Sequence, residues 1–136
     1  MSARPPDGSF TGRRPKRVPR EVERAVRIRA EGRCERCGKE VPTELHHRRF
    51  RSRGGEHTAS NLVALCGWGN HTGCHGFAHS DDPHATLQGW AVSAWGREPH
   101  EIGIPHAVYG WVTLTDRGTV IIHDRAPTEG DEHAEG

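Results

Sequence analysis

Helical spacing of apolar residues marks the first regular element of the chain, between Pro19 and Gly32. Four residues set this spacing: Val22, Ala25, Val26 and Ala30. Because they recur three or four residues apart, they share one face of a helix that proline opens and glycine ends. Arg24, Arg27 and Arg29 are expected on the solvated face of this amphipathic helix.

Two short apolar segments follow, and they are arranged like the strands of a hairpin. Residues 44–48 predict one strand, and residues 62–65 predict its antiparallel partner. The intervening loop, residues 49–61, turns at Gly54 and Gly55. It is long enough to carry function rather than serve as a mere connection.

The rest of the chain alternates short helices with apolar strands. A helix begins at residues 74–78, and a second short helix spans residues 84–88. Residues 90–95 predict a strand, and residues 111–115 and 119–123 predict a C-terminal β-hairpin. The tryptophans of these strands are expected to pack in a small core rather than to stack on bases. The whole pattern therefore predicts a small α+β domain.

Composition limits how far such a core can stabilise the chain. Only 32% of the 136 residues are hydrophobic, so another source of stability is needed. Charge is divided unevenly: residues 1–55 carry 16 Lys or Arg and 7 Asp or Glu, whereas residues 56–136 carry 3 and 11. This asymmetry suits one face turned towards an acidic polymer. A GC-rich genome would also produce abundant Arg, and that alternative stays open.

The two ends of the chain are poor in apolar residues. Residues 1–18 predict a disordered basic arm and residues 124–136 a disordered acidic tail, with one folded domain at residues 19–123. The arm is either a nucleic-acid contact or an inert solvated tail. No stretch has the apolar length of a signal peptide or a membrane span, so we expect a cytoplasmic protein without membrane contact.

Four cysteines indicate a structural zinc site. Cys34 and Cys37 are separated by two residues, which lets both thiolates of one tight turn reach a tetrahedral ion. Cys66 and Cys74 supply the other half, although seven residues rather than two separate them. Because no secretory signal is present, zinc is favoured over disulfides or free thiols. His71, in the loop between Cys66 and Cys74, is an alternative ligand in place of one thiolate.

Histidines gather around the predicted hairpin and the helix after it. His75 and His79 are four residues apart, so on a helix both imidazoles share a face and can bind one ion. His46 and His47 are adjacent, so on a strand their side chains point to opposite sides. One of this pair can therefore bind metal while the other acts on a substrate. Other histidines have no partner at ligand spacing: His57, His84, His100, His106, His123 and His133.

Together these motifs resemble the HNH endonuclease family, especially the small HNH proteins of tailed bacteriophages. The resemblance spans about residues 30–82 and rests on Cys34-x-x-Cys37, Leu45-His46-His47-Arg48, Gly54-Gly55, Asn61-Leu62, Leu65-Cys66 and Cys74-His75-Gly76 with His79. It implies a ββα-metal core, also called the HNH or His-Me finger fold. It also implies a metal-dependent DNA endonuclease or nickase.

The resemblance further implies a role for each motif residue. His46, His75 and His79 would hold a catalytic divalent ion such as Mg²⁺, Mn²⁺, Ni²⁺ or Zn²⁺, and His47 would be the general base. Asn61 would orient the loop by bonding its backbone. A neutral imidazole suits the base role, because a pKa near ~6.5 lets it take a proton from water at neutral pH. Closed structural zinc ligation is the alternative, and it would leave His47 without a role.

Arginines directly after the histidine pair are the predicted DNA contacts: Arg48, Arg49, Arg51 and Arg53. A basic loop beside the scissile phosphate would position the DNA backbone without reading sequence. DNA is the expected partner of a monomeric protein, and the phage resemblance implies genome packaging beside the terminase. One alternative is a zinc-stabilised DNA-binding module without catalysis, which would have no use for a base. Another is a toxin-type nuclease domain with an immunity partner, for which no delivery domain is recognised.

Overall fold

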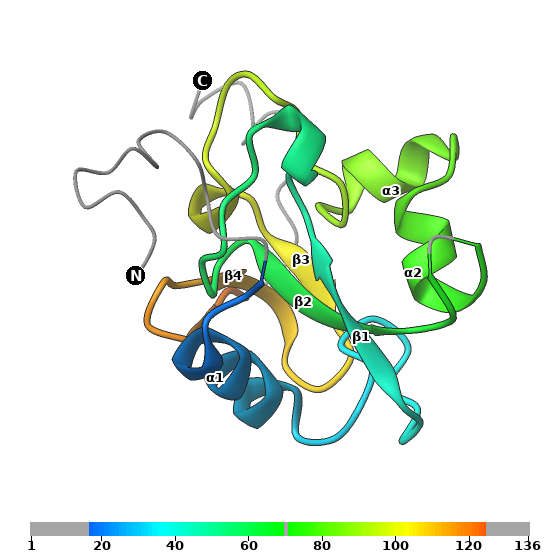
Figure 1. Ribbon diagram of the computed structural model, residues 1–136. Helices are drawn as coiled ribbons and strands as arrows, with labels where there is room; N and C mark the ends of the chain where they lie inside the picture. The colour runs from blue at the N-terminus through cyan, green and yellow to red at the C-terminus, as the bar shows by residue number, and fades with distance from the viewer. Residues whose placement is uncertain (1–16, 70, 125–136) are drawn as a thin grey trace, which may run out of the picture.

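A computed structural model describes residues 17–69 and 71–124 of the chain (Figure 1). These residues form three α-helices: α1 (Arg20–Ala30), α2 (Gly73–Ala78) and α3 (Pro83–Leu87). The same residues form one sheet of β1 (Thr43–His47) and β2 (Leu62–Cys66), and another of β3 (Ile104–His106), β4 (Gly110–Leu114) and β5 (Val120–Ile122). Two 3-10 turns lie in the connections: η1 (Arg51–Arg53) and η2 (Pro99–Glu101).

The predicted arm and tail fall almost wholly on residues 1–16 and 125–136, which lie outside the described part of the chain. Val18, the last residue assigned to the arm, is half-buried against the apolar face of α1, so the ordered region begins before Pro19. Within the described ranges, no helix has both the length and the apolar character needed to cross a membrane.

β1 and β2 form the predicted antiparallel pair. Leu45 pairs with Ala64, and His47 pairs with Leu62. The helix α2 follows β2 and contacts it, whereas α1 lies on the other side of the strand pair (Figure 1). The two strands and the following helix therefore have the order and spacing that the hydrophobic pattern predicts.

The core of the molecule is organised around β2, which is buried on both faces. Leu62 packs with Val26 of α1 in one apolar cluster. Val63 and Leu65 pack with Trp90 and with residues of the second sheet in the other. Burial on both faces explains why this strand is an unbroken apolar run instead of alternating with polar residues.

The C-terminal region differs from its prediction. The expected hairpin is present as β4 and β5, but β3 adds a third strand to it. Residues 90–95 were expected to form a strand, and this is wrong, because they contain no strand and only an isolated bridge from Val92 to Arg49. Trp90 is buried as expected, whereas Trp95 is 85% exposed, so core packing is wrong for Trp95.

Side chains from the segment after β1 explain why residues 90–95 form no strand. Arg53 donates to the carbonyl of Val92 at 3.2 Å, and Arg49 donates to the carbonyl of Ser93 at 2.8 Å. The backbone of Val92 in turn donates to the Arg48 carbonyl at 2.7 Å. Backbone groups that a partner strand would satisfy are satisfied by these contacts instead.

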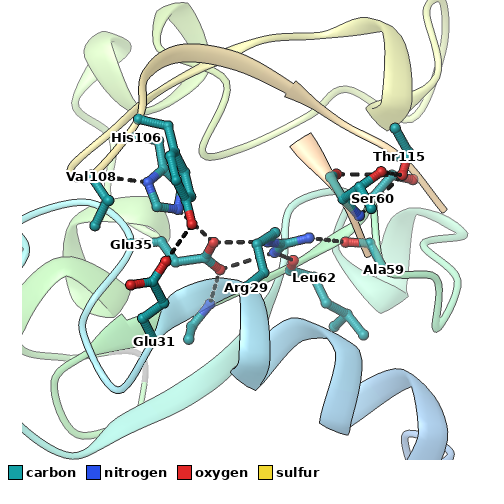
Figure 2. A network of polar contacts seen from close by, with 12 residues as sticks. Arg29, Glu31, Glu35, Ala59, Ser60, Leu62, His106, Val108 and Thr115 are labelled. Carbon is teal, nitrogen blue, oxygen red and sulfur yellow. Dashed lines mark hydrogen bonds and ion pairs between the residues drawn. The ribbon is translucent and has the colours of Figure 1, made fainter. Parts of the chain in front are cut away.

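A buried ion pair joins α1 to the turn between Cys34 and Cys37 (Figure 2). The Arg29 guanidinium donates to both carboxylate oxygens of Glu35 at 2.8 and 2.9 Å, and also to two backbone carbonyls. His106 of β3 donates to the same carboxylate at 2.8 Å. Arg29 is only 5% exposed, so its expected place on a solvated face is wrong.

Candidate functional site

Three histidines meet between β1 and α2. His46 lies on β1, His75 lies on α2, and His79 directly follows the last residue of α2. The ring centroid of His46 is 5.1 Å from that of His75 and 5.0 Å from that of His79. One ring nitrogen from each residue lies within 4.8 Å of the other two. The structure therefore brings together the three histidines that the sequence predicts as ligands of one ion.

Although α2 ends at Ala78, the spacing argument for its two histidines holds. The backbone N–H of His79 donates to the carbonyl of His75 at 3.3 Å, which continues the helical pattern by one residue. The two ring centroids are 5.0 Å apart. His79 is also stacked on Phe50, with centroids 4.5 Å apart and an interplanar angle of 20°. This stacking fixes its ring from the side of the loop.

In two of the three rings, a hydrogen bond selects the nitrogen that can bind metal. His46 Nε2 donates to the Trp90 carbonyl at 2.7 Å, which leaves the lone pair of its Nδ1 available. His75 Nδ1 donates to Glu44 Oε1 at 2.9 Å, which leaves the lone pair of Nε2. Carbonyl and carboxylate partners of this kind orient imidazole ligands in metal sites.

The buried Nδ1 atom of His46 is the feature that best supports an ion between the three histidines. This atom has no hydrogen-bond partner among the described residues. A buried polar atom without a partner is costly, and a metal bond would satisfy it. Burial, together with the neighbouring His75 and His79, lowers the pKa of His46 to about 3, against the opposing effect of the Trp90 carbonyl. The ring is thus neutral at pH 7, as metal ligation requires.

His47 ends β1 and contributes to a cavity of 220 Å³ beside these ligands. The other lining residues are Leu45, Phe50, Arg51, His75 and His79. His47 Nε2 lies 3.0 Å from His57 Nδ1. Sequence reasoning missed His57, because no spacing rule links a loop residue to a strand residue ten positions earlier. The candidate base therefore has a side-chain partner that no motif indicates.

Asn61 fastens the two ends of the loop that carries His57. Its Oδ1 accepts from the Arg49 N–H at 2.7 Å, and its Nδ2 donates to the carbonyls of Arg49 and Glu56 at 3.1 and 3.0 Å. Gly55 allows the close approach, because a Cβ there would lie 1.6 Å from the Arg49 carbonyl oxygen. The predicted contact of Asn61 with the loop backbone is therefore present.

Arg48 does not lie at the surface where a DNA contact requires it. Arg48 is fully buried, and its guanidinium donates to four backbone carbonyls: those of Ser60, Gly89, Pro99 and Ile102. Burial lowers its pKa to about 9, so it still carries a proton at pH 7. The expectation of a phosphate contact is wrong for Arg48, which instead ties β1 to the segments around α3 and η2.

The three other arginines of this segment differ in their surroundings. Arg49 donates to two carbonyls within residues 93–97 and pairs with Glu98, with 11% of its side chain exposed. Its guanidinium is thus engaged by the protein, so the expectation of a phosphate contact is wrong for Arg49 as well. Arg51 lines the cavity. Arg53 donates one bond to the Val92 carbonyl and lies over the Phe50 ring, but it is exposed on η1 and forms no ion pair among the described residues. These two remain in position to meet a phosphate.

The four cysteines form a second cluster. Sulfur atoms of Cys34, Cys37, Cys66 and Cys74 all lie within 4.8 Å of one another. The Sγ atoms of Cys37 and Cys66 are 3.7 Å apart, whereas a disulfide would be about 2.0 Å. Zn–S bonds of about 2.3 Å in a tetrahedron would place the sulfurs ~3.8 Å apart. The donor set therefore fits zinc, and the exposed His71 is not part of it.

Local hydrogen bonds also suit thiolates in this cluster. The backbone N–H of Cys37 donates to Cys34 Sγ at 3.4 Å, and that of Cys74 donates to Cys66 Sγ at 3.5 Å. Arg36 donates to Cys74 Sγ at 3.3 Å. The hydrogen bond between Cys34 and Cys74 lowers the pKa of the Cys34 thiol to about 4 and raises the pKa of the Cys74 thiol, so these two sulfurs share one proton. N–H donors around sulfur favour its ionised form, which is the form that binds metal.

The two clusters are adjacent in the chain, since Cys74 directly precedes His75. The helix α2 that carries them has six residues, too few to be stable alone. Anchoring Cys74 to β2 and to the turn of Cys34 would therefore hold His75 and His79 in place.

Comparison with known proteins agrees with this arrangement. Residues 34–80 match the family model described as HNH endonuclease. No curated protein and no solved structure matches the chain. The matched segment contains both clusters, together with His47, His57 and Asn61.

Proposed function

We propose that the protein is a metal-dependent endonuclease or nickase that hydrolyses phosphodiester bonds of DNA. One juxtaposition supports this most strongly: His47 shares a cavity with His75 and His79, two members of the three-imidazole cluster. Arg51 lines the same cavity and brings a positive charge to it. A proton acceptor, a set of metal donors and a cation are the groups that a phosphodiester hydrolase needs in one place.

His47 acts as the general base in this proposal. It takes a proton from water, the resulting hydroxide adds to phosphorus, and the bond from phosphorus to the leaving 3′ oxygen breaks. The leaving oxygen takes a proton from solvent. Arg51 and the exposed Arg53 position the phosphate backbone through its charge. His46, His75 and His79 hold a divalent ion, which when bound supplies Lewis-acid stabilisation of the phosphate and the leaving oxygen.

Imidazole nitrogens influence which ion suits the site. Mg²⁺ prefers oxygen ligands, whereas Zn²⁺ and Ni²⁺ accept imidazole well. Three nitrogen donors therefore favour Zn²⁺ or Ni²⁺ over Mg²⁺ and Mn²⁺ among the divalent ions considered. The four cysteines hold a separate structural zinc, whose binding free energy adds to the stability of a small core.

The likeness to small phage HNH proteins extends the proposal to phage DNA processing or packaging beside the terminase. Its support is the Gly-rich spacer of residues 67–73 before Cys74-His75-Gly76, which is similar in those proteins. Co-purification with a terminase subunit tests this part on its own.

Plasmid cleavage tests the proposed activity. Protein with a measured content of one tightly bound zinc is incubated with supercoiled plasmid and added Zn²⁺, Ni²⁺, Mn²⁺ or Mg²⁺. We expect nicked or linear product that depends on the added ion. His79→Ala should lower its yield strongly, with partial rescue as the ion concentration is raised, whereas His84→Ala, a change at an exposed histidine of α3, should not lower it. Binding of plasmid without cleavage under any ion would support a non-catalytic DNA-binding module instead.

A further inference from the structure

His57 contacts the candidate base, and neither the motifs nor the family match gives it a role. We propose that His57 is a positioning residue that holds His47 in the tautomer that accepts a proton from water. The inference rests on the proposed function, because it assigns His57 to the proton-transfer step. It concerns the partner of the base and involves none of the metal donors.

Only one arrangement of protons makes this contact compatible with a base. His47 Nε2 and His57 Nδ1 are 3.0 Å apart, so one donates a hydrogen bond to the other. If His57 donates, Nε2 of His47 accepts and Nδ1 carries the ring proton, which uses both nitrogens of the neutral ring. If His47 donates through Nε2–H, its Nδ1 keeps a lone pair. The second arrangement leaves a nitrogen that can take the proton of a water molecule.

The loop fixes His57 in this position. Asn61 donates to the carbonyl of Glu56, the residue directly before His57, at 3.0 Å. It also bonds both backbone groups of Arg49, two residues after His47. One amide side chain thus ties the backbone near His57 to the backbone near His47. This gives Asn61 an indirect effect on the base, through the placement of His57.

The contact should strengthen during the reaction. Once Nδ1 of His47 takes the water proton, the ring is a cation, and the hydrogen on Nε2 stays on His47 in a charge-assisted bond to His57. Such bonds are about twice as strong as neutral ones. An interaction that is stronger in the transition state raises kcat without tightening substrate binding. Removing it should lower kcat roughly tenfold, which corresponds to about 1.4 kcal/mol.

Two substitutions separate the hydrogen bond from the bulk of the ring. His57→Leu removes the acceptor, whereas His57→Asn keeps a polar atom close to the position of Nδ1. We expect His57→Leu to lower kcat about tenfold, with unchanged KM for plasmid and unchanged ion affinity, and His57→Asn to restore most of the rate. His84→Leu is the matched control, because His84 Nδ1 also has a partner, Asp82 Oδ1 at 2.9 Å, on the exposed helix α3. It should leave kcat unchanged.

A spectroscopic measurement tests the contact without relying on cleavage. The imidazole ¹⁵N shifts of His47, assigned by comparison with His47→Gln, report which nitrogen carries the proton in the zinc-loaded protein. We expect the Nε2–H tautomer in the wild type and in His57→Asn, and a mixture in His57→Leu. The melting temperature and zinc content of each variant show whether it is folded. If His57→Leu does not fold, the tautomer of His47 in the wild type and in His57→Asn still tests the proposal.

Three results would overturn the inference: wild-type kcat in folded His57→Leu, equal loss in His57→Asn and His57→Leu, or an Nδ1–H tautomer of His47 in the wild type. Absence of cleavage by the wild-type protein under every ion would refute the proposed function. The ¹⁵N shifts would then still decide whether His57 sets the tautomer of His47.

Discussion

Replacing Glu35 by Gln should lower the free energy of unfolding by about 3 kcal/mol. Burial of this carboxylate by itself would raise its pKa, but hydrogen bonds from His106 and Arg29 lower the pKa from 4.5 to about 2. At about 1.36 kcal/mol per pKa unit, the difference between these values corresponds to about 3 kcal/mol of preference for the charged form. Loss of one partner from a buried ion pair costs about the same, 3–5 kcal/mol.

The same helix supplies a matched control. Glu23 and Arg27 form an ion pair at 3.0 Å through Nε of Arg27. Arg29 also uses its Nε for Glu35, and adds a second bond through Nη2. The side chains of Glu23 and Arg27 are 44% and 42% exposed, whereas those of Glu35 and Arg29 are 0% and 2% exposed. Solvent screening makes exposed pairs of this kind contribute little. Glu23→Gln should therefore change the free energy of unfolding by less than about 0.5 kcal/mol.

Urea denaturation of zinc-loaded protein, followed by circular dichroism, measures both variants. A carboxylate with a lowered pKa contributes stability that is present above pH ~4.5 and is lost as pH falls towards 2. The wild type and Glu35→Gln share every other titrating group, so the difference between them isolates this carboxylate. That difference should stay constant from pH 7 to about 5 and shrink below pH ~4.5. Equal effects of the two variants, or a difference that grows in acid, would show that the buried Glu35 carboxylate does not stabilise the fold through its charge.

Three further predictions concern zinc, the arginines and the N-terminal arm. Cys34→Ser should unfold or aggregate the protein, and an unchanged melting temperature with unchanged zinc content would rule out the four-cysteine site. Arg48→Ala should cost about 3 kcal/mol or more in urea, because four backbone carbonyls lose their donor. Arg53→Ala loses only one bond to the Val92 carbonyl, so it should cost about 1 kcal/mol, and it should reduce the salt dependence of DNA binding by about one phosphate contact. Equal effects of the two arginine variants on stability would contradict their assignment. Removing residues 1–16 should weaken DNA binding and flatten its salt dependence without changing the melting temperature, and an unchanged slope would make the arm inert.

Local periodicity predicted those parts of the fold that are determined by neighbouring residues. The helix ending near Gly32, the strand pair that bears His46 and His47, and the C-terminal hairpin all follow from spacing and turn residues. Residues 90–95 did not, because their apolar pattern suits a strand while arginine side chains from a distant segment occupy their carbonyls. β3 was missed because three residues are too few for a pattern to register.

Residue type and spacing predicted the cysteine ligands and the pair His75 and His79, whereas the choice of His46 over His47 came from the resemblance to the HNH family. The structure brings the three proposed histidine ligands together in one cluster and the four proposed cysteine ligands together in another. Arginine is different, because its charge suits both a phosphate and a buried network, and sequence does not distinguish the two. Arg29 and Arg48 are therefore the clearest errors, each bonded to backbone carbonyls in the interior. His57 was missed because its contact with His47 depends on the path of the loop.

Ion binding and cleavage, measured in the same variants, separate the role of His47 as base from the role of His79 as ligand. Metal titration by calorimetry is run beside plasmid cleavage for wild type, His47→Ala and His79→Ala, all with their structural zinc retained. We expect His47→Ala to bind the second ion as the wild type does, while its cleavage rate falls by about 10²–10⁴. His79→Ala should lose the ion itself, with partial rescue by added metal. Loss of ion affinity in His47→Ala as severe as in His79→Ala, or cleavage by His47→Ala at the wild-type rate, would contradict these roles.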